Sequence, residues 1–358
     1  MTENFRIEIT MNNSEISVIW TILLFMKKIF LLILVTCLTY YCMAQSRTIG
    51  HVISIDPAFD NLIGKDAKIE ILADSFAWSE GPVWVKNGGF VLFSDIPNNT
   101  IFKWKEGEGL SVFLKPSGYT GRLPYSHEPG SNGLIINDKG QLVVCEHGDR
   151  RISAMPLSLG GKRTLADNYQ GKRFNSPNDI VQRSTGDYYF TDPYYGLPDR
   201  EKDVTSREIN FTGVYRLSSD GKLTLLIDNL LPNGLAFSPD EKILYVGQSD
   251  PDKPIIMSYP VNPDGSLGTG KLFFDATSLA KQGLKGVPDG MKVDNKGNLF
   301  TTGPGGLLVI SPEGKLLGRI EIPQPTANCA WGEDGSTLFI TANMFLCRIK
   351  TKTSGARF

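Results

Sequence analysis

The chain has 358 residues, of which 41% are hydrophobic and 21% are charged, and its formal net charge is −1. This balance is typical of a globular protein long enough for one large domain or two modest ones. A charge so near zero gives no electrostatic reason to expect nucleic acid or an anionic membrane surface as a partner. Small neutral or weakly charged ligands remain as candidates.

The first ~45 residues differ in composition from the rest of the chain. Lys27 and Lys28 precede an apolar run that ends in "CMAQS", with small residues at the positions that a signal peptidase reads. We predict a signal peptide over residues 1–45 that is cleaved after Ala44. Export would place the mature protein in the periplasm or outside the cell, without stable membrane association.

Two alternatives concern this N-terminal segment. Met26 could be the true start, which would make residues 1–25 an extension. The upstream apolar stretch "ISVIWTILLF" would instead favour a membrane anchor.

The cysteines are considered next, because an exported protein meets an oxidising compartment. Cys37 and Cys42 fall within the predicted signal peptide, which leaves Cys145, Cys329 and Cys347. Their number is odd and no pair shows metal-ligand spacing, so buried free thiols are predicted, with one disulfide as the alternative.

An internal repeat organises the rest of the chain. Each copy reads as a polar residue, an apolar strand, a turn rich in Asn, Asp, Gly and Lys, and a second strand rich in Val, Leu, Phe and Tyr, which predicts a hairpin. We call the six polar residues the anchors; they are 39 to 56 residues apart, at Glu80, Asn132, Asn178, Asn233, Asp289 and Asn328. Two more strands fit between successive anchors. The repeat therefore predicts an all-β protein, a six-bladed β-propeller with four-stranded antiparallel blades around a central channel, over residues 46–358.

The two ends of this domain are complementary. The last repeat supplies only about three strands, whereas "AKIEILADSF" at 67–76 precedes the first anchor and has no blade of its own. We predict that this segment completes the sixth blade, which would leave no open sheet edge.

The anchors should converge, because the first strand of a propeller blade lies nearest the axis. One Glu, one Asp and four Asn would form a ring of oxygen donors at one mouth of the channel. Such donors suit a divalent cation, with Ca²⁺ favoured and Mg²⁺, Mn²⁺ or Zn²⁺ as alternatives, although a ring without His or Cys argues against a tight zinc site. The competing interpretation is turn chemistry, since Asn and Asp form turns, but Glu80 is a poor turn former.

The segments after each second strand should return to the same mouth. They include His147 in "EHGDRR" and both Tyr194 and Tyr195 in "TDPYYG". His147 is a candidate hydrogen-bond donor to substrate or proton carrier, and Tyr195 a candidate substrate contact. Rim packing is the alternative for the tyrosines.

Several motifs together resemble the senescence-marker-protein/gluconolactonase family, the group that includes regucalcin. They are "SEGPVW", "FNSPNDIV", "YFTDPYYG", "GVYR", "PNGLAFSPDEKILYV" and "PDGMKVDNKGNLF", and "CEHGDRRI" resembles the microbial gluconolactonase branch. The resemblance runs from about residue 70 to 348 and implies a six-bladed propeller with one divalent ion.

The resemblance also implies roles for individual anchors. It assigns Glu80, Asn178, Asn233 and Asp289 as metal ligands, with Asp289 also the base. It leaves Asn132 and Asn328 either to support the ligands or to face the substrate. One departure is Pro177, which stands beside Asn178 where the animal lactonases carry an Arg that holds sugar hydroxyls.

The expected function is metal-dependent hydrolysis of a lactone. The cation would polarise the carbonyl of a sugar lactone, Asp289 would take a proton from water, and His147 or a water molecule would protonate the leaving alkoxide to yield the aldonic acid. No G-x-S-x-G motif or Cys/His pairing competes. The alternatives are hydrolysis of other esters or phosphotriesters, and a non-catalytic binding propeller. Nothing in the sequence determines the oligomeric state.

Overall fold

The structure is a computed structural model that describes residues 12–43, 47–158 and 160–356. The chain divides into two compact units, residues 1–47 and 48–358. The first unit contains helix α1 (Asn13–Met43). Among the described residues, no helix is both long enough and apolar enough to cross a membrane. The predicted cleavage site after Ala44 lies outside the described residues.

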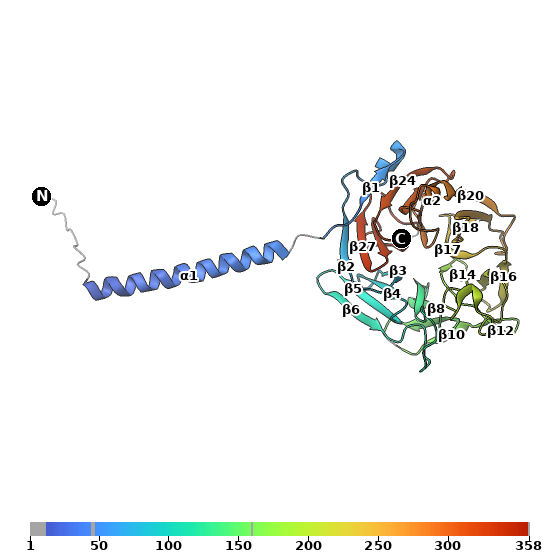
Figure 1. Cartoon of the computed structure of the whole chain (residues 1–358), viewed down its shortest axis with the longest axis horizontal. Coiled ribbons are helices and arrows are strands. Elements are labelled where there is room, and N and C mark those ends of the chain that lie inside the picture. Colours follow the sequence, from blue (N-terminus) through green and yellow to red (C-terminus); the bar gives the residue numbers. More distant parts are fainter. Residues whose placement is uncertain (1–11, 44–46, 159, 357–358) are drawn as a thin grey trace. The chain divides into compact units, whose positions relative to one another are not determined.

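The second unit is a six-bladed β-propeller, as the repeat predicts, with its sheets arranged around one axis (Figure 1). In chain order, the first three blades are β3 (Ser79–Val85), β4 (Phe90–Asp95), β5 (Thr100–Lys105) and β6 (Gly109–Leu114); β7 (Ser131–Ile136), β8 (Gln141–Glu146), β9 (Arg151–Pro156) and β10 (Arg163–Ala166); and β13 (Ile180–Gln182), β14 (Tyr188–Asp192), β15 (Gly213–Leu217) and β16 (Leu223–Ile227). A small hairpin, β11 (Asn168–Tyr169) with β12 (Lys172–Arg173), separates the second and third blades.

The remaining three blades follow the same plan. They are β17 (Pro232–Phe237), β18 (Ile243–Gln248), β19 (Ile255–Pro260) and β20 (Lys271–Asp275); β21 (Met291–Val293), β22 (Leu299–Gly303), β23 (Gly306–Ile310) and β24 (Leu316–Glu321); and β25 (Thr326–Gly332), β26 (Thr337–Ala342) and β27 (Phe345–Lys350) with β2 (Ile69–Ala73). Three short helices lie in connecting segments: η1 (Pro57–Asn61), η2 (Arg200–Lys202) and α2 (Thr277–Lys281).

The N-terminal strand β2 closes the ring, as predicted. It pairs antiparallel with β27, with Ile69 opposite Ile349 and Ile71 opposite Cys347. The sequence did not predict β1 (His51–Ser54), which pairs with β24 as a fifth, outermost strand of the fifth blade. Both N-terminal strands, β1 and β2, therefore pair with strands from the C-terminal part of the chain.

The hydrophobic core is divided into six clusters, one between each pair of adjacent blades. Alternation along the strands produces this division: on β4, Val91 and Phe93 pack toward the sixth blade, whereas Leu92 packs toward the second. Cys145, Cys329 and Cys347 lie inside these clusters as buried free thiols. The apolar side chains of these clusters thus pack between blades and hold neighbouring blades together.

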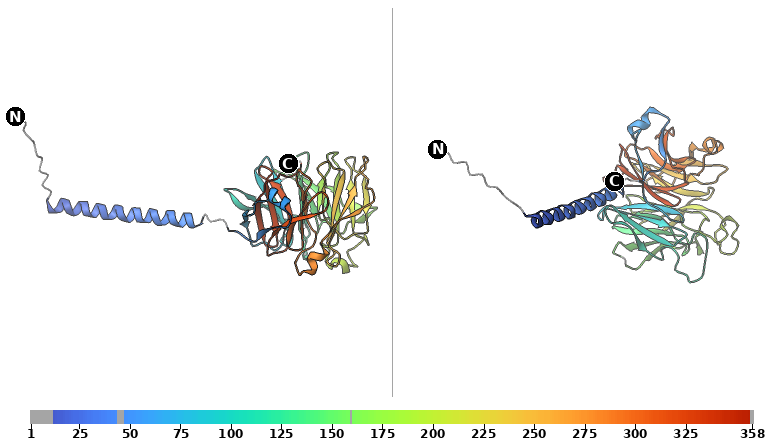
Figure 2. Two further views of the ribbon diagram at one scale, coloured as in Figure 1. Left: turned by 90° about the horizontal axis from the view of Figure 1, so that it is seen from above. Right: turned by 60° about the vertical axis from the view of Figure 1, so that its left-hand side comes forward.

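The two faces of the propeller differ. Figure 2 (left) shows α2 projecting from one face, while the C-terminal end of the chain lies on the opposite face. On the latter, a cavity of about 330 Å³ is lined by the far ends of the innermost strands, among them Trp84, Leu134 and Trp331. The anchors lie at the other ends of those strands.

Candidate active site

The six anchors lie where the innermost strands begin. Glu80, Asn132, Asn233 and Asn328 belong to β3, β7, β17 and β25, and Asn178 and Asp289 precede β13 and β21. Asp289 is half-buried and the other five are at most 5% exposed. The innermost strands contact one another in sequence around the axis. The structure therefore brings all six predicted positions to one end of the propeller.

Glycines allow the anchors to approach each other closely. A Cβ atom at Gly81 would lie 2.0 Å from the backbone oxygen of Asn132, and one at Gly234 would lie 2.1 Å from that of Asp289. Real side chains do not tolerate such contacts. The residue after an anchor is glycine in four of the six blades, at Gly81, Gly133, Gly234 and Gly290.

β-Bulges reorient the anchors. The register between the first two strands shifts in four blades, between Glu80 and Val83, Ser131 and Leu134, Pro232 and Leu235, and Thr326 and Asn328. A bulge interrupts the alternation of side chains and redirects one of them, which is why bulges are common beside active sites. In these four blades the bulge therefore separates the anchor from the apolar alternation of the rest of its strand.

The two carboxyl anchors, Glu80 and Asp289, lie close enough for their charges to interact. Burial raises the pKa of Glu80 to about 8, with a further contribution from the charge of Asp179, although the Gly81 N–H, 2.7 Å from Oε2, opposes the shift. Burial also raises the pKa of Asp289 well above its usual range, followed by the charge of Glu80. In the described residues, neither carboxyl forms a salt bridge. Two like charges buried together without a counter-charge are costly.

The oxygen donors fit a hard divalent cation. Asn233 Oδ1 is buried and has no hydrogen-bond partner in the described residues. Two carboxylates and two amide oxygens, from Glu80, Asp289, Asn178 and Asn233, are donors that calcium accepts. No group of three or more His, Cys, Asp or Glu side chains is placed to hold a metal within the described ranges. Asparagines thus make up half of the candidate ligand residues.

His147 lies beside the anchors and is completely buried. Its Nδ1 is 3.1 Å from the backbone oxygen of Glu128, and its Nε2 is 3.3 Å from the amide nitrogen of Asn132. A carbonyl accepts and an amide N–H donates, so the ring is the tautomer protonated on Nδ1. Burial lowers its pKa to about 4. In this arrangement His147 carries its proton on Nδ1 and faces the amide nitrogen of Asn132 with Nε2.

Tyr195 connects the third and fourth blades. Its hydroxyl is 2.5 Å from Ser249 Oγ, and burial raises the pKa of its phenol. Tyr194 packs against it edge-on, with ring centroids 5.5 Å apart. The phenol therefore stays protonated and can donate a hydrogen bond.

Two acidic residues near the anchors were missed from the sequence. Asp179 follows Asn178 at a position that is glycine in four other blades; it is buried, and its Oδ2 has no hydrogen-bond partner in the described residues. That break in the glycine pattern could have revealed it. Glu128 lies in an irregular loop outside the repeat, where no periodic signal exists.

Fold and site together define a class: a six-bladed propeller with buried carboxyl and amide groups gathered at one end of its axis. The family profile described as "SMP-30/Gluconolactonase/LRE-like region" matches residues 78–344. The chain is 45% identical to a gluconolactonase of Zymomonas mobilis subsp. mobilis over 325 residues, which is 87% of this chain and 89% of that protein.

Solved structures give the same result. A gluconolactonase from Xanthomonas campestris is 30% identical, with a TM-score of 0.73 over 85% of this chain and 97% of that chain. A calcium-binding regucalcin from Agrobacterium tumefaciens shares the fold, with a TM-score of 0.62 and 19% identity over 80% of this chain and 95% of that chain. The chain belongs to the SMP-30/gluconolactonase/regucalcin family.

Proposed function

We propose that this protein is a lactone hydrolase of the gluconolactonase type, which opens a sugar lactone to the aldonic acid with the help of a divalent cation. The observation that carries the proposal is the 45% identity to a gluconolactonase over 87% of the chain. Two observations support the metal-dependent part: the charge of Glu80 acts on Asp289, and the buried Asn233 Oδ1 has no hydrogen-bond partner in the described residues.

Glu80, Asn178, Asn233 and Asp289 would hold the cation, with Ca²⁺ favoured by the all-oxygen donor set. A cation bound there would supply Lewis-acid polarisation of the ester carbonyl. Burial raises the pKa values of Glu80 and Asp289, and the charge of Glu80 raises that of Asp289 further. A bound cation would offset both effects by stabilising the ionised carboxylates.

The side chains of the protein would divide the remaining work. Asp289 takes the proton of the attacking water at its carboxylate, as a general base. Asn132, oriented by His147, and the Tyr195 hydroxyl bind oxygens of the substrate. Because His147 has no proton to give on Nε2, a water molecule protonates the leaving alkoxide.

The substitution Asp289→Asn tests whether Asp289 is the general base. Loss of the general base should lower kcat for glucono-δ-lactone by about 10²- to 10⁴-fold, measured in a pH-stat after subtraction of spontaneous hydrolysis. Asp252→Asn, an exposed aspartate, is the matched control and should retain wild-type activity. Circular dichroism would establish that both variants fold. Full activity of Asp289→Asn would rule out this base.

Removal of the cation gives a second test. Dialysis against a chelator should abolish acid release, and calcium, magnesium or manganese should restore it. A wild-type protein that melts at a higher temperature with calcium but releases no acid from lactones would be a binding propeller instead.

Export is a further part of the proposal. The basic pair and apolar run before "CMAQS" favour cleavage after Ala44. Mass spectrometry of the protein purified from its native compartment should give an N-terminus at Gln45, and an uncleaved chain in the membrane fraction would contradict export.

A further inference from the structure

We propose that Glu128 and Arg200 form a recognition pair for the hydroxyl groups of the substrate, so that the enzyme selects polyhydroxylated lactones over unsubstituted ones. This inference rests on the proposed lactonase function and names the substrate class of that site.

The pair joins two loops from different blades. Glu128 Oε1 accepts a hydrogen bond from Arg200 Nη2 at 2.7 Å. Glu128 lies in the segment between β6 and β7, and Arg200 begins η2 in the segment between β14 and β15. The side chain of Glu128 is 21% exposed and that of Arg200 is 49% exposed. The pair is thus partly buried on one side and open to solvent on the other.

Both members of the pair lie close to the candidate catalytic groups. His147 Nε2 lies 3.3 Å from the amide nitrogen of the anchor Asn132. Burial lowers the pKa of His147, and the charge of Arg200 lowers it further. The backbone oxygen of Glu128 also accepts from His147 Nδ1. The pair is therefore connected to the anchor Asn132 through His147, on the side of the site where Asn132 would face the substrate.

The pair has unused hydrogen-bonding capacity. Within the described residues, neither Glu128 Oε2 nor Nε and Nη1 of Arg200 make a hydrogen bond. A carboxylate only accepts and a guanidinium only donates, whereas a hydroxyl does both. Neighbouring hydroxyls on a sugar ring can satisfy the two together, through hydrogen bonds strengthened by charge. An unsubstituted lactone offers no partner for either group.

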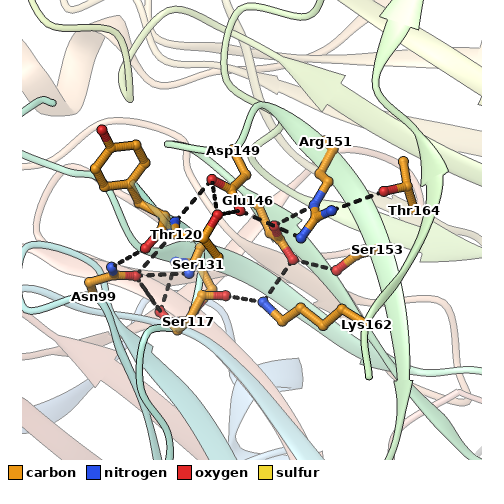
Figure 3. A network of polar contacts seen from close by, with 12 residues as sticks. Asn99, Ser117, Thr120, Ser131, Glu146, Asp149, Arg151, Ser153, Lys162 and Thr164 are labelled. Carbon is orange, nitrogen blue, oxygen red and sulfur yellow. Dashed lines mark hydrogen bonds and ion pairs between the residues drawn. The ribbon is translucent and has the colours of Figure 1, made fainter. Parts of the chain in front are cut away.

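A network of polar contacts fixes the loop that carries Glu128 (Figure 3). Asn99 Oδ1 accepts from the backbone N–H groups of Ser117, Gly118 and Tyr119, and Asp149 accepts from Thr120. At the other end of the loop, the N–H of Gly148 donates to Pro129 O at 3.0 Å. A loop held at both ends can present a carboxylate in a defined position, which a specificity residue requires.

The experiment compares two lactones of the same ring size, glucono-δ-lactone and hydroxyl-free δ-valerolactone. Glu128→Gln and Arg200→Ala should each lower kcat/KM for gluconolactone by about 10- to 100-fold, mainly through KM, because a charge-assisted hydrogen bond is lost. The same variants should change kcat/KM for δ-valerolactone by no more than about 2-fold. Lys202→Ala, an exposed cation in the same short helix, is the control and should match the wild type.

The outcomes separate the two proposals. An equal loss for both lactones would show that the pair only supports the fold or His147, and would overturn the recognition role. Unchanged kinetics for both lactones would overturn it as well. A wild-type enzyme that opens neither lactone above the spontaneous rate would overturn the lactonase function, and the recognition role with it. Thermal melting of each variant distinguishes lost binding from lost folding.

Discussion

At the scale of single residues, the site depends on polar groups whose partners determine their chemistry. Asn233 Oδ1 is buried without a partner, and Glu80 and Asp289 repel each other. His147 differs, because both of its ring nitrogens are used in holding Glu128 and Asn132. The oxygens of the anchors thus suit a cation, whereas His147 is placed to orient the side chain of Asn132.

The burial of His147 predicts a pH dependence of stability. The unfolded chain takes up a proton on this residue below pH about 6.5, whereas the folded protein does so only near pH 4. Stability from this source is therefore complete above pH 6.5 and is lost as the pH falls, by about 2 kcal/mol at pH 5. Urea unfolding of the wild type and of His147→Gln at pH 7 and pH 5 measures the difference.

His147→Gln should lose less stability than the wild type between these two pH values. Exposed His127→Gln is the matched control and should follow the wild type. The neighbouring charged groups Glu128 and Arg200 are unchanged in both variants. An equal loss in all three proteins would show that His147 does not carry the effect.

At the scale of elements, β2 is the part of the chain that closes the ring. Ile69, at its start, is 1% exposed and packs in the cluster between the fifth and sixth blades. Ile55, from the same N-terminal region, is 52% exposed. The same substitution can therefore be made at both isoleucines, of which only Ile69 is buried in the sheet that closes the ring.

Ile69→Ala should lower the free energy of unfolding by about 2–5 kcal/mol, because it leaves a cavity where the two ends of the domain meet. Ile55→Ala should change it by less than about 0.5 kcal/mol. Denaturant unfolding measures both. Similar small changes in the two variants would indicate that β2 contributes little to closure, and deletion of residues 46–76 would then leave a folded domain.

At the scale of the whole molecule, the six interblade clusters hold the innermost strands in a ring. The anchors lie at one end of that ring, where the strands begin. Ligands drawn from four blades would connect those blades when a cation binds. A cation that binds only the folded ring must stabilise it by mass action.

Calcium at about 100 times its dissociation constant should therefore raise Tm by about 5 °C, measured by differential scanning calorimetry. Asp289→Asn should lose most of this increase, while Asp252→Asn should keep it. A wild-type Tm that does not respond to calcium, magnesium or manganese would contradict the cation site.

The repeat by itself determined the architecture, because each copy encodes a local hairpin and six such copies arranged radially make a six-bladed propeller. It also determined which residues meet at the axis, from Glu80 to Asn328, since their place in the repeat sets their place in the blade. The pairing of β2 followed from a missing fourth strand. Those features depend on short stretches of chain, which a sequence displays directly.

Only the tertiary structure decided the rest. Glu128 lies in a loop without a period, and the tautomer of His147 depends on two atoms from other segments. The strand β1 joined the fifth blade through pairing with β24, more than 250 residues away in the chain. Hydrogen bonds across such separations depend on where whole blades come to lie, and no local pattern of residues records that position.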